Sequence, residues 1–281
     1  RCSYCPNVVG DRLGENVRME TAVWRTLLDN LAEIGFAHVL VLNSYNEPLA
    51  DRAILDRLRE ARAALPKARI MLYTNGDYLD PAYVEALAEA GLDHMHISIH
   101  MRKDDTYSDL YAINRMIEVS VRIGAAAKVT RVRSNEWILA RVPHPRMEIE
   151  MRGINFMRHG TDRGGLIADI KPAAARTAPC YFPFAHFHMG FSGNIVPCCH
   201  IRSDRPEHAD YLVGNLRDYG TIFQAYASAR AAAWRRELVG QGPKRAPCDT
   251  CAAGFLAAPQ AAEVFARAHR QHVAAAQPAA G

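Results

Sequence analysis

The chain has 281 residues, 49% of them hydrophobic, and a formal net charge of +4 from 34 basic and 30 acidic side chains. This composition suits one large folded domain with a smaller one beside it, and the mild, dispersed charge argues against a nucleic-acid surface. No apolar run approaches the roughly 20 residues of a membrane span, and no signal peptide is visible. We therefore expect no membrane association and a cytoplasmic location.

Helical periodicity and short apolar runs alternate through the first half of the chain. Four segments are predicted helices: residues 20–35, a segment with Ile54, Leu55 and Leu58 on one face, residues 80–91 and about 106–123. Four runs are predicted strands: residues 38–42, 69–73, 94–100 and 128–133. This alternation predicts βα units around a parallel sheet, whose working loops lie at the carboxyl ends of the strands.

The pattern changes after residue 140, where Pro143, Pro145 and a Gly-rich loop at 160–165 break the alternation. From residue 180 onward we expect a hairpin over 186–196, an amphipathic helix over about 216–238 and a cysteine-bearing loop. These features predict three parts: an α/β domain over 1–170, a small domain over 171–258, and a C-terminal helix and flexible tail over 259–281.

Seven cysteines without a secretory signal indicate a reducing compartment, where close pairs are more often metal or redox sites than disulfides. Cys2 and Cys5 open the chain, and the last third contains Cys180, Cys198, Cys199, Cys248 and Cys251. The four without Cys199 suit a structural zinc or an iron–sulfur cluster, and their spacing alone does not choose between the two. Cys199 is one too many for such a site: it is either a small buried residue beside a ligand or a redox-active, hydrogen-donating thiol.

Several motifs together resemble the radical S-adenosylmethionine (SAM) enzymes. The opening residues 1–7 resemble the second half of the family's Cys-xxx-Cys-xx-Cys signature. The loop Asn46-Glu47-Pro48 resembles its Gly-Gly-Glu-Pro loop, and Thr74-Asn75-Gly76 matches a frequent ending of its third strand. The segments 180–198, 214–216 and 247–251 resemble its C-terminal SPASM or twitch domains. With a single four-cysteine set, the chain is more similar to the short twitch type, of which a dehydrogenase of an aminocyclitol is an example.

Two departures accompany this resemblance. The first cysteine of the signature would lie four positions before Cys2, outside the chain and together with an opening strand, which we attribute to truncation. Tyr45-Asn46 replaces the glycine pair that precedes Glu-Pro in the family pattern.

The resemblance implies a partial (β/α)6 TIM-like barrel followed by a twitch/SPASM domain of a β-hairpin plus a helix. It implies SAM and two [4Fe–4S] clusters as cofactors, with an external one-electron reductant such as flavodoxin or ferredoxin. The SAM-binding cluster would use Cys2 and Cys5, and an auxiliary cluster would use the distal four cysteines. Reductive cleavage of SAM would produce a 5′-deoxyadenosyl radical that takes a hydrogen atom from the substrate.

The resemblance also assigns roles to side chains. Tyr4 would contact the adenine, Glu47 with Asn46 would face the SAM amino group, and Arg131 or Arg133 would pair with the SAM carboxylate. The candidates for the ribose and methionine moieties are Thr74, Asn75 and Ser98, and the catalytic candidates are His100 and, as a hydrogen-atom donor, Cys199. Each has a plainer alternative: Glu47 as a helix cap, Thr74-Asn75-Gly76 as a turn, and either arginine as a surface charge.

The expected function is oxidation or epimerisation of a polar small molecule, such as a sugar or aminocyclitol alcohol, in a biosynthetic pathway. One alternative is radical modification of a peptide or protein side chain. Another is a zinc-stabilised α/β binding protein without radical chemistry.

Overall fold

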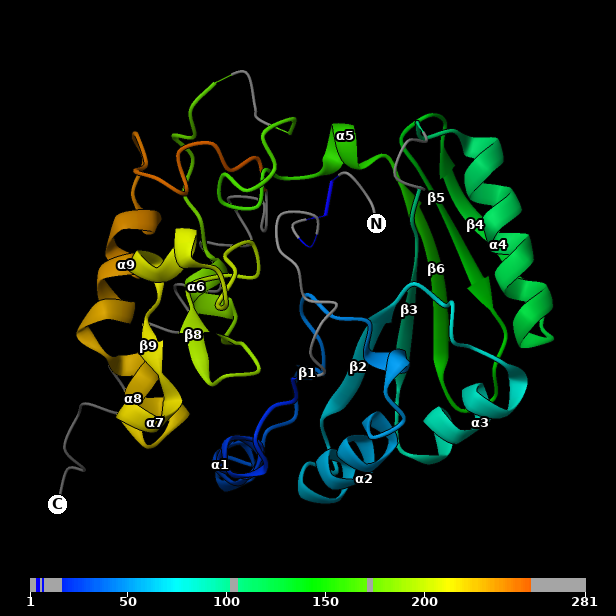
Figure 1. Cartoon of the computed structure of the whole chain (residues 1–281), viewed down its shortest axis with the longest axis horizontal. Coiled ribbons are helices and arrows are strands. Elements are labelled where there is room, and N and C mark those ends of the chain that lie inside the picture. Colours follow the sequence, from blue (N-terminus) through cyan, green and yellow to red (C-terminus); the bar gives the residue numbers. More distant parts are fainter. Residues whose placement is uncertain (1–3, 6, 8–16, 102–105, 171–173, 254–281) are drawn as a thin grey trace, which may run out of the picture.

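The computed structural model describes residues 4, 5, 7, 17–101, 106–170 and 174–253 (Figure 1). The predicted C-terminal helix and tail lie outside these residues, as does Cys2. Six described strands form the main sheet in the order β1-β2-β3-β6-β5-β4, and three form a small antiparallel sheet in the order β7-β8-β9. Figure 1 shows the small sheet and its helices on one side of the main sheet.

The main sheet is parallel over β1, β2, β3 and β6, and antiparallel over β5 and β4. Its strands are β1 (Val39–Val41), β2 (Arg69–Thr74), β3 (His94–Ile99), β4 (Lys128–Arg133), β5 (Trp137–Val142) and β6 (Glu148–Ile154). The helices of this half are α1 (Thr21–Glu33), η2 (Pro48–Ala50), α2 (Ile54–Ala64), α3 (Pro81–Glu89), α4 (Asp109–Ile123) and α5 (Phe156–His159). The predicted α/β class is confirmed, and the sheet is open between β1 and β4 in the described part of the chain.

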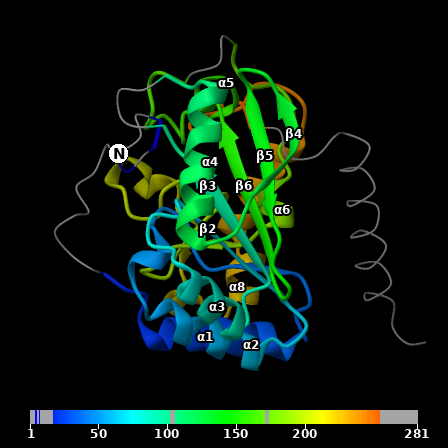
Figure 2. The ribbon, with the colours of Figure 1, turned by 90° about the vertical axis from the view of Figure 1, so that its right-hand side faces the viewer.

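Successive residues of each strand alternate between two environments, because side chains of a strand point to opposite faces of the sheet. Ile70, Leu72, Met95, Ile97 and Met151 are fully buried under the helices. Figure 2 shows α4 lying over this outer face, where it contacts β3, β5 and β6. The alternate positions of β3 and β6 are polar, with His94, His96 and Ser98 on β3 and Glu148, Glu150 and Arg152 on β6. This opposite face of the sheet is turned toward the small domain (Figure 1).

One strand prediction was wrong in its pairing. Residues 128–133 form a strand, but it is the exposed edge strand β4, which pairs antiparallel with β5 rather than parallel with β3. A parallel neighbour requires a crossover connection, whereas only three residues separate β4 from β5. The missed neighbour of β3 is β6, whose residues Glu148 to Ile154 alternate between polar and apolar.

The small domain contains the predicted hairpin but not the predicted single helix over 216–238. Its elements are α6 (Phe182–Ala185), β7 (His188–Met189), β8 (Asn194–Val196), η3 (Pro206–Tyr211), β9 (Gly214–Asn215), α7 (Leu216–Tyr219), α8 (Ile222–Ala227) and α9 (Ala229–Val239). Gly220 has a φ of 75° and ends α7. Thr221 and Ser228 then cap α8 and α9, each accepting a backbone N–H at 3.1 and 3.2 Å respectively. No helix among the described residues is long and apolar enough to cross a membrane.

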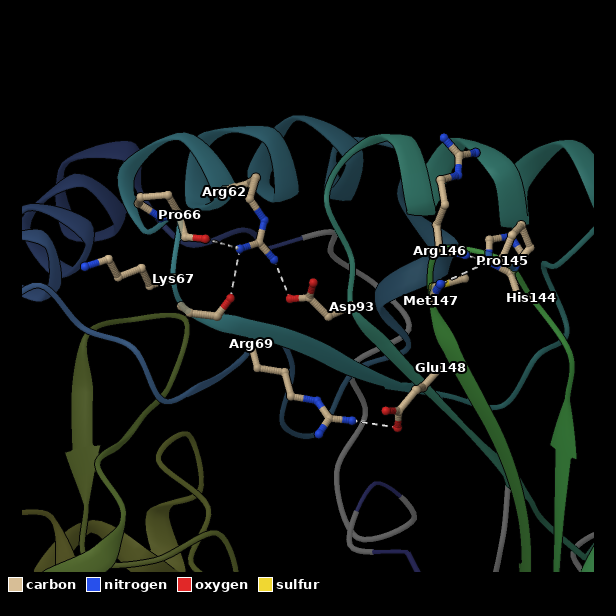
Figure 3. Close-up of a pocket in the computed structure, with 11 residues that line it drawn as sticks. Arg62, Pro66, Lys67, Arg69, Asp93, His144, Pro145, Arg146, Met147 and Glu148 are labelled. Atoms are coloured by element: carbon tan, nitrogen blue, oxygen red, sulfur yellow. Dashed lines mark hydrogen bonds and ion pairs between the residues drawn. The ribbon is translucent and has the colours of Figure 1, made fainter.

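Figure 3 shows a hollow at the amino ends of β2, β3 and β6, the opposite ends from the predicted working loops. Arg69 at the start of β2 pairs with Glu148 at the start of β6 through Nη2 and Oε2, 2.7 Å apart. Arg62 pairs with Asp93 in the same hollow. These two ion pairs connect α2 with the starts of β2, β3 and β6 at this end of the sheet.

Arg62 binds the loop before β2 and the loop before β3. Its guanidinium donates to the carbonyl oxygens of Pro66 (3.1 Å), Ala68 (2.8 Å) and Gly91 (3.0 Å). Its stem lies where a side chain on residue 91 would be, since an added Cβ would come 2.8 Å from the Cβ of Arg62. The glycine that ends the α3 segment is therefore required both for its φ of 99° and for this packing.

Replacing Arg62 with methionine (R62M) removes the guanidinium donor from several carbonyl oxygens and from the Asp93 carboxylate, which still accepts from the backbone N–H of Ile70. We expect the free energy of unfolding to fall by about 2–4 kcal/mol, measured by chemical denaturation. The matched control is R59M, because Arg59 on the same helix makes only an exposed pair with Asp56. A loss as small as that of R59M, expected within about 0.5 kcal/mol, would contradict the role given to Arg62.

Candidate active site

The carboxylate of Glu47 joins two loops at the carboxyl ends of the strands. Oε1 accepts from the backbone N–H of Leu49 (3.1 Å) and from the Thr74 hydroxyl (2.7 Å), and Oε2 accepts from the backbone N–H of Asn75 (2.7 Å). Burial raises the pKa of Glu47, and these three donors oppose that shift. A carboxylate has about four acceptor sites, so one remains for a ligand cation.

Both plainer alternatives for these loops are confirmed, alongside their position in the site. Glu47 caps η2. Thr74 and Asn75 form a turn in which Gly76 N–H donates to the Thr74 hydroxyl (3.0 Å) and Gly76 has a φ of 77°. Asn46 is exposed, and its Oδ1 accepts from Ser44 N–H (3.2 Å), so it is held within its own loop.

Tyr4 anchors the opening motif on the end of β3. It is 9% exposed, its ring stacks on Phe156 at 4.6 Å, and its hydroxyl accepts from the backbone N–H of Met101 (3.1 Å). The same hydroxyl lies 3.1 Å from Nδ1 of His100 and can donate its proton there. Burial lowers the pKa of His100 to about 4, so this imidazole is neutral and holds Tyr4, with the neighbouring Cys5, in place.

A row of polar side chains crosses the inner face of the sheet, and we call Tyr73, His96, Glu150 and Arg152 the polar row. The strand register places Tyr73 of β2 beside His96 of β3, and His96 beside Glu150 of β6. Nδ1 of His96 lies 3.6 Å from Oε1 of Glu150, and Nη2 of Arg152 lies 3.2 Å from the same oxygen. Burial, together with the nearby charge of Arg152, lowers the pKa of His96 to about 3, so His96 is neutral. Ser98, also predicted for the site, is the register partner of Arg152.

Tyr73, Glu150 and Arg152 were missed from the sequence. The polar-apolar alternation of residues 148–154 was the signal that could have placed Glu150 and Arg152 on one face. Alternation along β2 would likewise have placed Tyr73 on this face, since it is exposed between the buried Leu72 and Thr74.

Arg131 and Arg133 are not brought to the Glu47 loops. Both lie on the exposed edge strand β4, which β5 and β6 separate from β3. The guanidinium of Arg131 lies over the Trp137 ring at 5.7 Å, and Nε of Arg133 pairs with Glu136 at 3.1 Å. The structure therefore favours the surface-charge interpretation for both.

The distal cysteines converge on one small cavity in the small domain. Cys180, Cys198, Cys248 and Cys251 all line it, and we call it the cysteine cavity. Burial, together with the neighbouring thiols, raises the pKa of Cys248 to about 12. Burial likewise raises the pKa of Cys198 and Cys251. Thiols buried together in this way become thiolates when a positively charged centre replaces their protons.

This set of donors suits two kinds of inorganic group. A structural zinc takes four sulfurs about 2.3 Å from one point. An iron–sulfur cluster is also held by four thiolates. In the described part of the chain, no three His, Cys, Asp or Glu side chains lie closely enough together to hold one metal ion.

Cys199 does not line the cysteine cavity. Burial raises the pKa of its thiol, and the nearby charge of Arg163 lowers it. Burial also raises the pKa of Tyr73, and the Cys199 thiol is one of the neighbours that add to that shift. Cys199 therefore lies next to a cavity residue in the chain and near Tyr73 of the polar row.

Comparison with known proteins gives the family. Residues 1–138 match the model of the radical SAM superfamily. The first half of the chain is therefore a radical SAM domain. The prediction of a radical SAM enzyme is thus confirmed, and with it the requirement for a [4Fe–4S] cluster and SAM.

Individual relatives agree with this assignment. The chain is 25% identical over 198 residues to the S-adenosyl-L-methionine-dependent 2-deoxy-scyllo-inosamine dehydrogenase of Niallia circulans, covering 70% of this chain and 67% of that protein. It is 31% identical over 134 residues to the PqqA peptide cyclase of Gluconobacter oxydans, covering 46% of this chain and 34% of that protein.

Solved structures show the same fold. The crystal structure of BtrN in complex with AdoMet and 2-DOIA superimposes with a TM-score of 0.62 at 20% identity, covering 90% of this chain and 87% of that one. BtrN in an open conformation gives a TM-score of 0.56 at 19% identity, over 90% and 86% of the two chains.

The residues present fit the cofactors of a radical SAM enzyme. Cys5 lies beside the anchored Tyr4, and the remaining acceptor site of Glu47 suits the ammonium group of SAM. Cys2 and Cys5 would supply two of the three thiols that such a SAM-binding cluster takes. When bound, that cluster and SAM supply the radical, and the chain's part is to position SAM and substrate.

Stability should fall in mild acid. His96 and His100 are neutral in the fold, with pKa values lowered to about 3 and about 4, whereas an unfolded histidine titrates near 6.5. Between these values the unfolded state binds more protons, so stability decreases as pH falls below 6.5, by about 1.4 kcal/mol per pH unit for each histidine. Denaturation from pH 7 to 4.5 should show this slope.

The variant H96Q lacks one of the two imidazoles, so the loss of stability should be smaller by about 1.4 kcal/mol per pH unit. The control H38Q removes an exposed imidazole and should leave the slope as in the natural protein. An unchanged slope in H96Q would contradict a neutral, buried His96.

Proposed function

We propose that this protein is a radical SAM dehydrogenase that oxidises a hydroxyl group of a polar small molecule, of the sugar or aminocyclitol type. The main support for this proposal is that the cysteine cavity lies near a polar face of the sheet, where a substrate can bind. An auxiliary cluster there would accept the second electron of a two-electron oxidation. The relative named 2-deoxy-scyllo-inosamine dehydrogenase supports this substrate class.

The polar row supplies groups for such a substrate. The Arg152 side chain is 40% exposed, and its Nε is buried without a hydrogen-bond partner among the described residues. A buried N–H without an acceptor is costly, so a substrate oxygen at this position would satisfy it. Glu150 can accept the hydroxyl proton, while neutral His96 and the Tyr73 hydroxyl can orient neighbouring hydroxyl or amino groups.

The oxidation balances with one hydrogen atom, one proton and one electron. The carbon that bears the hydroxyl loses its hydrogen atom to the 5′-deoxyadenosyl radical, which yields 5′-deoxyadenosine. The hydroxyl proton then goes to Glu150, and the remaining electron goes to the auxiliary cluster. The product is a ketone.

The protein expressed from its full natural coding sequence should make equal amounts of 5′-deoxyadenosine and ketone under anaerobic, reducing conditions. The probe substrate is 2-deoxy-scyllo-inosamine, and both products are measured by mass spectrometry. SAM cleavage without ketone would contradict the substrate class. Zinc without iron, and no SAM cleavage, would instead support a zinc-stabilised binding protein.

A redox-neutral epimerisation is the competing outcome, in which a thiol returns a hydrogen atom and Cys199 is the spare thiol. We expect oxidation, so C199A should keep full activity, with no solvent deuterium at the reacting carbon in deuterated buffer. Loss of product in C199A, together with deuterium in the natural protein's product, would establish the thiol as donor.

The second candidate function is modification of a peptide. It is favoured by the match to PqqA peptide cyclase, whose identity of 31% exceeds that of the dehydrogenase but over fewer residues. Incubation with a peptide encoded beside the gene, followed by mass spectrometry for a loss of two hydrogens, distinguishes it.

A further inference from the structure

A closed ring of contacts joins three loops that come from distant parts of the chain. Asn7, two residues after Cys5, donates from Nδ2 to the carbonyl oxygen of Tyr45 (2.9 Å) and accepts at Oδ1 from Arg202. The Arg202 guanidinium lies over the Tyr45 ring, 4.7 Å from its centroid. The Tyr45 hydroxyl closes the ring by donating to the backbone carbonyl of Cys199 (2.5 Å).

Arg202 is a fixed partner in this ring rather than a surface charge. It is 1% exposed, and Asp204 binds its Nε and Nη2 at 2.8 and 2.7 Å. Its backbone N–H donates to Nδ1 of His208 at 2.8 Å. A buried guanidinium retains its charge at a large cost unless it is paired, so Asp204 and Asn7 hold it in one orientation under the Tyr45 ring.

Tyr45 connects the Glu47 loop with the segment that contains Cys198. It precedes Glu47 by two residues, and its hydroxyl reaches the residue next to Cys198 of the cysteine cavity. Burial raises the pKa of Tyr45, so the phenol stays neutral and remains a donor. One side chain therefore connects the SAM-binding loop, the opening motif through Asn7, and the segment that carries a cavity thiol.

We propose that Tyr45 is a positioning residue that fixes the SAM-binding loops against the Cys198–Cys199 segment. Its function is to fix the distance between the substrate radical, which forms next to SAM, and the electron acceptor in the cysteine cavity. This inference rests on the proposed function, because it requires two centres that act on one substrate. A defect at Tyr45 should therefore uncouple the reaction rather than stop SAM cleavage.

The decisive variant is Y45F, which removes only the hydroxyl and keeps the ring under Arg202. We expect 5′-deoxyadenosine formation to stay within about twofold of the natural protein, with iron content unchanged. Ketone formed per 5′-deoxyadenosine should fall about fivefold, the factor expected for one hydrogen bond. The matched control is Y226F, because the Tyr226 hydroxyl also donates to a backbone carbonyl, that of Phe184 at 3.0 Å, in the small domain.

Three outcomes overturn the proposal. The first is a normal product ratio in Y45F, and the second is an equal loss of SAM cleavage and product, which would make Tyr45 a SAM-binding residue. The third is a Y226F variant as uncoupled as Y45F, which would indicate a general effect on the domain.

Hydrogen exchange separates failure of this inference from failure of the proposed function. If the natural protein cleaves SAM but forms no ketone, the proposed function is wrong, and exchange then decides on Tyr45. Backbone amides of residues 43–49 and 198–203 should exchange faster in Y45F than in the natural protein and in Y226F. Unchanged exchange in both segments would overturn the positioning role.

Discussion

The two-residue period of the parallel strands is the constraint from which the site follows. It directs Ile70, Met95 and Met151 against the helices and leaves the alternate positions of the same strands for polar groups. Because β2, β3 and β6 lie side by side in register, those alternate positions form one continuous polar row. The carboxyl ends of β1 and β2 add the Glu47 carboxylate and its donors at the edge of that row.

The small domain completes the site through buried polar contacts rather than through its own regular structure. Its helices and strands are short, yet its four cavity thiols come from three separate segments and meet at one place. Thr250, between two of these thiols, donates to the fully buried Asp162 of the preceding domain. Asn30 of α1 likewise accepts from the first backbone N–H of α8 at 2.9 Å. Contacts of this kind set the position of the cavity relative to the sheet.

Local signals made part of this predictable. Asp80 before Pro81 gave the start of α3, where its side chain accepts from Tyr83 N–H at 2.7 Å, and Gly91 gave the end of that segment. The cysteine spacing gave the members of the cavity. The β4–β5 hairpin was missed because its pairing partner, not its composition, decides its place in the sheet. The Tyr45 and Arg202 contacts could not be predicted, since their partners lie 154 and 195 residues away in the chain and follow no repeating pattern.

The proposed oxidation requires an iron–sulfur cluster in the cysteine cavity, separate from the one that binds SAM. Replacing both Cys2 and Cys5 with alanine removes the opening motif's thiols and leaves the cavity intact. Anaerobically purified protein of this variant should contain about four irons and four sulfides per chain, with an EPR signal on reduction, and should not cleave SAM. A variant that contains no iron, or a single zinc, would contradict the account.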